Sequence, residues 1–117
     1  MRIVEHTGQE WEQWRPGVHT RMRVSAEIGA AQLCIFEQQC DPGCGAPSHL
    51  HTVEEVLTVL AGRAEIWIGD ERAALTAGQS LIVPAGHRHG FLNAGETTLH
   101  IEAILAAPLF GPVTQRD

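Results

Sequence analysis

GCGAPSHLHTVEEVLTVLAG, at residues 43–62, is the stretch of sequence that decides the fold and the candidate site. It places His49 and His51 two residues apart, and Glu55 four residues further on. Side chains at positions i, i+2 and i+6 of an extended strand point to the same face. If one strand runs unbroken through this stretch, two imidazoles and one carboxylate project together. That ligand set is typical of sites for redox-capable divalent metals.

A second stretch, GQSLIVPAGHRHGFLN at residues 78–93, contains a further histidine, His89. A third imidazole from a neighbouring strand would complete a site of three nitrogens and one oxygen. The bend Pro84-Ala85-Gly86 restricts the backbone shortly before His89 and should direct this residue toward the interior.

The two stretches resemble the paired motifs of the cupin family, G-x5-H-x-H-x3-4-E-x6-G and G-x5-P-x-G-x2-H-x3-N. The resemblance covers about half of the chain directly, and the flanking strand-like runs fit it. It implies a double-stranded β-helix, the jelly-roll β-barrel of cupin type, with His49, His51, Glu55 and His89 as metal ligands inside it. Every fixed position of the motifs is filled here, by Gly43, His49, His51, Glu55, Gly62, Gly78, Pro84, Gly86, His89 and Asn93.

The rest of the chain has the pattern of an all-β domain. Strand-like runs recur every eight to twelve residues between turn signals, which is typical of a barrel or sandwich. With 117 residues the chain has length for one domain. We expect an N-terminal arm at residues 1–20, which carries Trp11 and Trp14, a cupin barrel at residues 21–107, and a C-terminal tail at residues 108–117.

Composition excludes several classes of partner and chemistry. The formal net charge of −6 and the pI near 5.6 argue against nucleic acid and anionic membranes as partners. All basic side chains are arginine, so Schiff-base catalysis by lysine is excluded, and the absence of tyrosine excludes a tyrosyl acid. Three cysteines without CxxC spacing, and an N-terminus unlike a signal peptide, predict a cytoplasmic protein.

Two residues are candidates for proton transfer. Glu55 could shuttle a proton as well as bind metal. His87, two residues before His89, could act as a general acid or base near neutral pH; the alternative is a histidine at the barrel rim without a catalytic role. Further candidates for contact with a ligand lie on other strands, namely His100 or Glu102, and Gln32, Cys34, Phe36 and Gln38.

Two functions from different classes fit these features. The first is a metal-dependent enzyme, of dioxygenase or isomerase type, that acts on a small oxygenated organic molecule. The second is a non-catalytic module that binds a small ligand or regulates; fold alone does not decide between them. We expect one divalent transition metal per chain, with Fe, Mn, Ni, Cu and Zn all suited to the ligands; the enzyme would use it in catalysis, and the module could bind its ligand with or without it. The tryptophans of the arm and the outward-facing Val56 and Leu60 predict a homodimer.

Overall fold

The structure, a computed structural model, describes residues 1–110. In that range it contains strands and one short 3-10 helix, η1. The elements are β1 (Glu12–Arg15), β2 (Val18–Val24), η1 (Ala26–Ile28), β3 (Cys34–Cys40), β4 (Gly45–His49), β5 (Glu55–Ala61), β6 (Arg63–Ile68), β7 (Glu71–Thr76), β8 (Ser80–Val83), β9 (His89–Asn93) and β10 (Leu99–Leu105).

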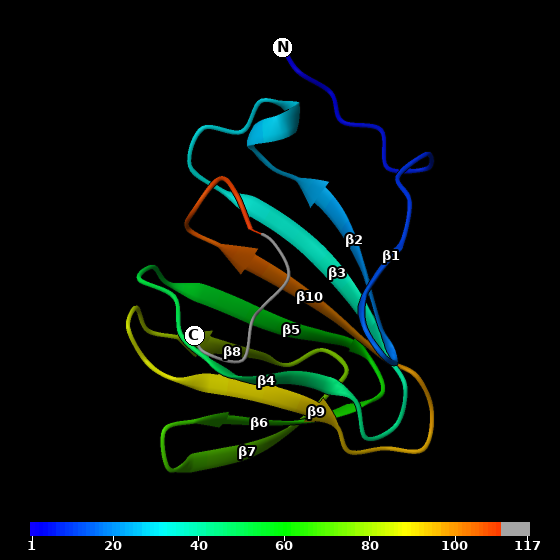
Figure 1. The fold of residues 1–117 in the computed structure, drawn as a ribbon, viewed down its shortest axis with the longest axis vertical. Coiled ribbons are helices and arrows are strands. Elements are labelled where there is room, and N and C mark those ends of the chain that lie inside the picture. The colour runs from blue at the N-terminus through cyan, green and yellow to red at the C-terminus, as the bar shows by residue number, and fades with distance from the viewer. Residues whose placement is uncertain (111–117) are drawn as a thin grey trace.

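The strands form two antiparallel sheets, as Figure 1 shows. The larger sheet has six strands in the order β1-β2-β3-β10-β5-β8, and the smaller has four in the order β4-β9-β6-β7. Strands that are distant in sequence are neighbours, because β10 lies between β3 and β5. The predicted all-β jelly roll is therefore confirmed.

The core lies between the two sheets and follows from the alternation of side chains along each strand. In β10, Leu99, Ile101, Ala103 and Leu105 are buried, whereas the residues between them are half-buried on the outer face. His100 and Glu102 therefore point away from the interior. Each fully buried aliphatic side chain stabilises the fold by about 1.5–3 kcal/mol relative to its exposed state.

The N-terminal residues are part of the larger sheet. The β2 strand continues across residue 20, where the sequence predicted the boundary between arm and barrel, and β1 pairs with β2 of the same chain. Trp14 packs inward against Phe36, with ring centroids 5.8 Å apart. Trp11 lies on the outer face, next to His100 and under the guanidinium of Arg21. Of the predicted tail, residues 108–110 are described, and the remainder lies outside the described residues.

Gly62 makes the tight reversal between β5 and β6 possible. Its φ of 88° lies in the left-handed region that favours glycine. A Cβ atom there would also lie 2.9 Å from the carbonyl oxygen of Thr98. The glycine predicted at this hairpin is therefore required for two reasons, the backbone conformation and the close packing.

Candidate metal centre

The four candidate ligands converge from three strands and a connecting loop. His49 is the last residue of β4, Glu55 the first of β5, and His89 the first of β9. His51 lies in the connection between β4 and β5. The sequence analysis assumed that one unbroken strand carries His49, His51 and Glu55. That assumption is wrong, because His49 and Glu55 belong to different sheets. The residues meet because the chain crosses from one sheet to the other between them.

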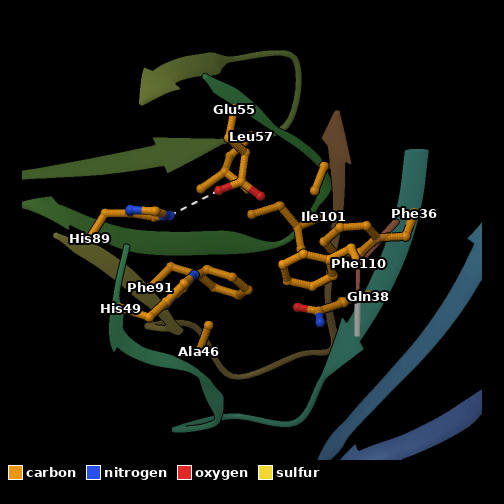
Figure 2. Close-up of a pocket in the computed structure, with 11 residues that line it drawn as sticks. Phe36, Gln38, Ala46, His49, Glu55, Leu57, His89, Phe91, Ile101 and Phe110 are labelled. Carbon is orange, nitrogen blue, oxygen red and sulfur yellow. Dashed lines mark hydrogen bonds and ion pairs between the residues drawn. The ribbon is translucent and has the colours of Figure 1, made fainter. Parts of the chain in front are cut away.

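The ligand atoms of these four residues all lie within 4.8 Å of one another. His49 and His89 are direct partners in the pairing of β4 with β9, and their ring centroids are 4.4 Å apart. Glu55 Oε1 lies 2.9 Å from His89 Nε2, the contact dashed in Figure 2, and 3.8 Å from His51 Nε2. Apart from His51, which is half-buried, the cluster is buried.

Backbone carbonyl groups fix the orientation of two rings. His49 Nδ1–H donates to the carbonyl oxygen of Pro47 at 2.6 Å, and His89 Nδ1–H donates to that of His87 at 2.9 Å. Each ring therefore presents Nε2 to the cluster. Metal-binding histidines commonly donate their second N–H to such an acceptor, which sets the tautomer.

The two buried rings differ in their tendency to take up a proton. Burial lowers the pKa of His49 to about 4, so this ring is neutral at pH 7 and able to coordinate. Burial also lowers the pKa of His89, but the hydrogen bond to Glu55, the carbonyl of His87 and the carboxylate charge outweigh it, so the net pKa is raised. A cation that enters the cluster replaces the proton shared between His89 and Glu55.

Three members of the cluster, His49, Glu55 and His89, close one end of an apolar cavity between the sheets (Figure 2). Gln38 is the polar wall residue outside the cluster, and its Nε2 donates to Thr20 Oγ1 at 3.0 Å. All three phenylalanines of the chain line this cavity. The lining residues beyond the cluster are Phe36, Gln38, Ala46, Leu57, Phe91, Ile101, Ala103 and Phe110.

Several residues that the sequence proposed for the site lie elsewhere. His87 is exposed, its ring bonds to the carbonyl oxygen of Ala85 at 3.2 Å, and it does not line the cavity. His100, on the outer face, bonds through Nε2 to Glu37 at 2.5 Å. Gln32 is exposed and Cys34 is buried in the core, whereas Phe36 and Gln38 do line the cavity as predicted.

Sequence reasoning missed Phe91 and Phe110. Phe91 continues the inward alternation from His89, so strand parity could have identified it. Phe110 lies beyond the last strand, in the predicted tail, where no periodicity applies. The available signal was a single aromatic residue in a segment without a strand pattern.

The donor set fits a divalent transition metal. Three imidazoles, two of them with tautomers set by backbone carbonyls, and one carboxylate supply four ligand atoms in a compact group. This set leaves positions for other ligands on a metal that accepts five or six. Burying these polar groups together without a cation is costly.

Fold and site together define a class of protein, a small jelly-roll barrel with a histidine and glutamate cluster in its interior. The chain belongs to the cupin family, since the Cupin domain profile matches residues 36–105.

Relatives differ widely in what they do. The chain is 31% identical over 99 residues to polyketide synthase CurC of Streptomyces cyaneus, covering 80% of this chain and 62% of that one. It is 26% identical over 104 residues to auxin-binding protein 1 of Arabidopsis thaliana, covering 80% and 52%. The chain thus spans less than two thirds of the length of these curated relatives. The polyketide cyclase RemF of Streptomyces resistomycificus superposes with a TM-score of 0.76 at 20% identity, over 98% of this chain and 88% of that one.

Within residues 1–110, no helix has the length and apolar character needed to cross a bilayer.

Proposed function

We propose that this cupin is a metal-dependent enzyme that acts on a small oxygenated organic molecule. The observation that carries the proposal is the position of the cluster, whose four ligand atoms lie within 4.8 Å of one another and three of whose residues line an apolar cavity. His49, His51, Glu55 and His89 would hold one divalent metal ion, with iron, manganese, nickel, copper and zinc as candidates. Such a cavity gives the ligand an apolar environment and a polar anchoring point.

When bound, the metal supplies Lewis acidity toward oxygen atoms of the ligand. The protein supplies the remaining parts. Leu57, Phe91 and Ile101 exclude water and hold the carbon skeleton of the substrate. Glu55 lines the cavity, so its carboxylate, besides holding the metal, is the group placed to take or return a substrate proton. His87 is exposed and could act on a part of the substrate outside the cavity.

The reaction type within this proposal is dioxygenase or isomerase chemistry. Similarity to CurC and to the polyketide cyclase RemF supports polyoxygenated carbon chains or rings as substrates. Oxygen consumption separates the two reaction types, because an isomerisation or cyclisation proceeds without dioxygen.

The test is metal analysis of protein purified without a His-tag, followed by screening with dicarbonyl, catecholic and flavonoid-like compounds. Oxygen uptake and substrate loss are both recorded, with and without metal. We expect metal-dependent turnover that is lost in Glu55→Gln and retained in His19→Ala, an exposed histidine on β2. Failure of every metal-loaded preparation to convert any compound would contradict the enzyme proposal.

A second candidate function is a non-catalytic module that binds a small ligand. Similarity to auxin-binding protein 1 favours this alternative. Saturable binding of a screened compound without any turnover would support it over the enzyme.

We also propose a homodimer, formed through the outer face of the larger sheet. Val56 lies between Ile104 and Ile82 in the strand pairing, and these three side chains form an apolar row on that face. Ile82 is 62% exposed on the edge strand β8, and Leu60 is 43% exposed. A two-fold related copy would cover this row. Light scattering at micromolar concentration tests the assembly, and an Ile82→Glu variant should be monomeric.

A cytoplasmic location remains part of the proposal. Its support is the free state of Cys34, Cys40 and Cys44.

A further inference from the structure

Phe110 lies inside the candidate site although it belongs to no strand. Its ring stacks on that of Phe36, with centroids 4.8 Å apart and an angle of 10° between the planes. It lies edge-on to His51, with centroids 5.1 Å apart, and 5.6 Å from Trp14 (Figure 2 shows the Phe36 pair). One aromatic side chain thus joins the cavity wall to a candidate metal ligand.

With Phe110 in this position, the cavity has no space for an organic ligand. The space open to a water molecule is about 20 Å³, enough for roughly one water. A substrate that binds in this cavity must therefore displace a side chain that lines it.

Phe110 is the lining residue that can leave with least disruption. The lining side chains outside the cluster otherwise come from β3, β4, β5, β9 and β10, whose backbones are paired within the sheets. Among residues 1–110, the segment after β10 makes two backbone hydrogen bonds to other parts of the chain. Ala106 N–H donates to Glu54, and Ala26 N–H donates to the carbonyl oxygen of Pro108. Leu109, next to Phe110, is 62% exposed, so a rotation after Pro108 removes the ring without breaking a strand.

We propose that Phe110 occupies the place of a planar ring of the ligand, and that the ligand enters when Phe110 leaves. This inference rests on the proposed function and specifies its substrate class, an aromatic or otherwise planar unsaturated ring that carries chelating oxygens. A flat ring that replaces Phe110 retains the stacking on Phe36, whereas a saturated ring of the same size does not fit a parallel arrangement. The neighbouring cluster can then bind the oxygens of the same molecule.

The experiment compares two probes that differ in ring planarity, salicylate and cis-2-hydroxycyclohexanecarboxylate. Each is titrated by calorimetry into the zinc-loaded full chain, since zinc excludes redox turnover. We expect salicylate to bind about fivefold more tightly to the wild-type chain. In Phe110→Ala, salicylate should bind about tenfold more tightly than in the wild type, if the closed state outweighs the open state by about ten to one.

Two control variants distinguish the effect of the Phe110 ring from effects of neighbouring residues. Leu109→Ala, in the same segment, should leave both affinities unchanged, and Phe36→Ala should abolish the preference for the planar probe. Weaker salicylate binding in Phe110→Ala would overturn the proposal, because Phe110 would then be part of the wall that holds the ligand. Equal affinity of the two probes for the wild type would overturn the ring preference.

A final measurement distinguishes this inference from the proposed function. Indole, which has no chelating oxygen, is titrated into the metal-free chain and observed by ligand NMR. Indole should bind Phe110→Ala more tightly than the wild type, whether or not metal binds. If none of the five candidate metals binds the wild type, the proposed function fails; if a metal binds and Phe110→Ala shows no gain for indole or salicylate, only the role of Phe110 fails.

Discussion

Replacing Asn93 by alanine should destabilise the fold strongly without removing a metal ligand. Asn93 is 2% exposed and makes three side-chain hydrogen bonds. Its Nδ2 donates to the carbonyl oxygens of Cys40 at 3.0 Å and Thr97 at 2.8 Å, and its Oδ1 accepts from Gly95 N–H at 2.8 Å. These bonds connect β3 with the turn between β9 and β10.

The magnitude follows from these three bonds. Each contributes about 1 kcal/mol, so Asn93→Ala should lower the free energy of unfolding by about 3 kcal/mol. With a denaturant slope of about 1.5 kcal/mol per molar urea, the unfolding midpoint should fall by about 2 M. Asn93→Asp retains the acceptor for Gly95 but loses both donated bonds, so it should be destabilised by at least about 2 kcal/mol.

Urea unfolding followed by tryptophan fluorescence measures the effect. Thr98→Ala, an exposed residue of the same turn, is the matched control and should stay within about 0.5 kcal/mol of the wild type. Metal stoichiometry of folded Asn93→Ala should be unchanged, because His89 lies four residues away along β9, about 13 Å on an extended strand. A loss below about 1 kcal/mol would refute the reasoning, since the three bonds would then not hold the turn.

Three further predictions concern the cluster and the outer face. His49→Ala and His89→Ala should each lose most bound metal by elemental analysis while circular dichroism stays unchanged; unchanged stoichiometry in both variants would place the ligands elsewhere. Because the pKa of His89 is raised, apparent zinc affinity by calorimetry should fall about tenfold per pH unit once the pH drops below that raised pKa. His49, with its pKa of about 4, should take up a further proton only when the pH falls to that value. Glu37→Gln should destabilise the fold by about 2–3 kcal/mol at pH 7, because Arg23 and His100 lose a buried carboxylate partner. Burial raises the pKa of Glu37, but bonds from His100, Arg21 and Arg23 outweigh it and lower it below 4.5. The stabilisation is thus present above pH 4.5 and lost as pH falls through the lowered pKa, so wild type and variant should converge in acid unfolding.

Sequence reasoning predicted the fold because the strand pattern and the two motifs are local features. It also identified the four residues that cluster, although the argument for His49 and Glu55 assumed a single strand. The chain crosses between sheets at residues 50–54, and strand parity does not carry through such a crossing. The same limit applies to His87, which shares the parity of His89 but precedes the start of β9.

The role of Phe110 was not accessible from the sequence for a different reason. Its position depends on a stacking contact with Phe36, 74 residues earlier in the chain. Neither periodicity nor a turn signal specifies such a contact, because it depends on how the last segment returns over the barrel. The sequence also does not specify which alternating side chains of β10 face the core. The pairing of β10 with β3 and β5 decides this.

The two carbonyl groups that orient His49 and His89 have a consequence for how this site can vary. A carbonyl oxygen is present whatever side chain its residue carries, so positions 47 and 87 can change identity while both rings keep their direction. What must be kept instead is the close approach of the β4 and β9 backbones. A Cβ atom at Gly45 would lie 2.1 Å from the carbonyl oxygen of Phe91, and one at Gly90 would lie 2.7 Å from that of Ala46. Randomised libraries should therefore tolerate many residues at positions 47 and 87 but retain glycine at positions 45 and 90. New specificities can then arise while the candidate metal ligands keep their arrangement.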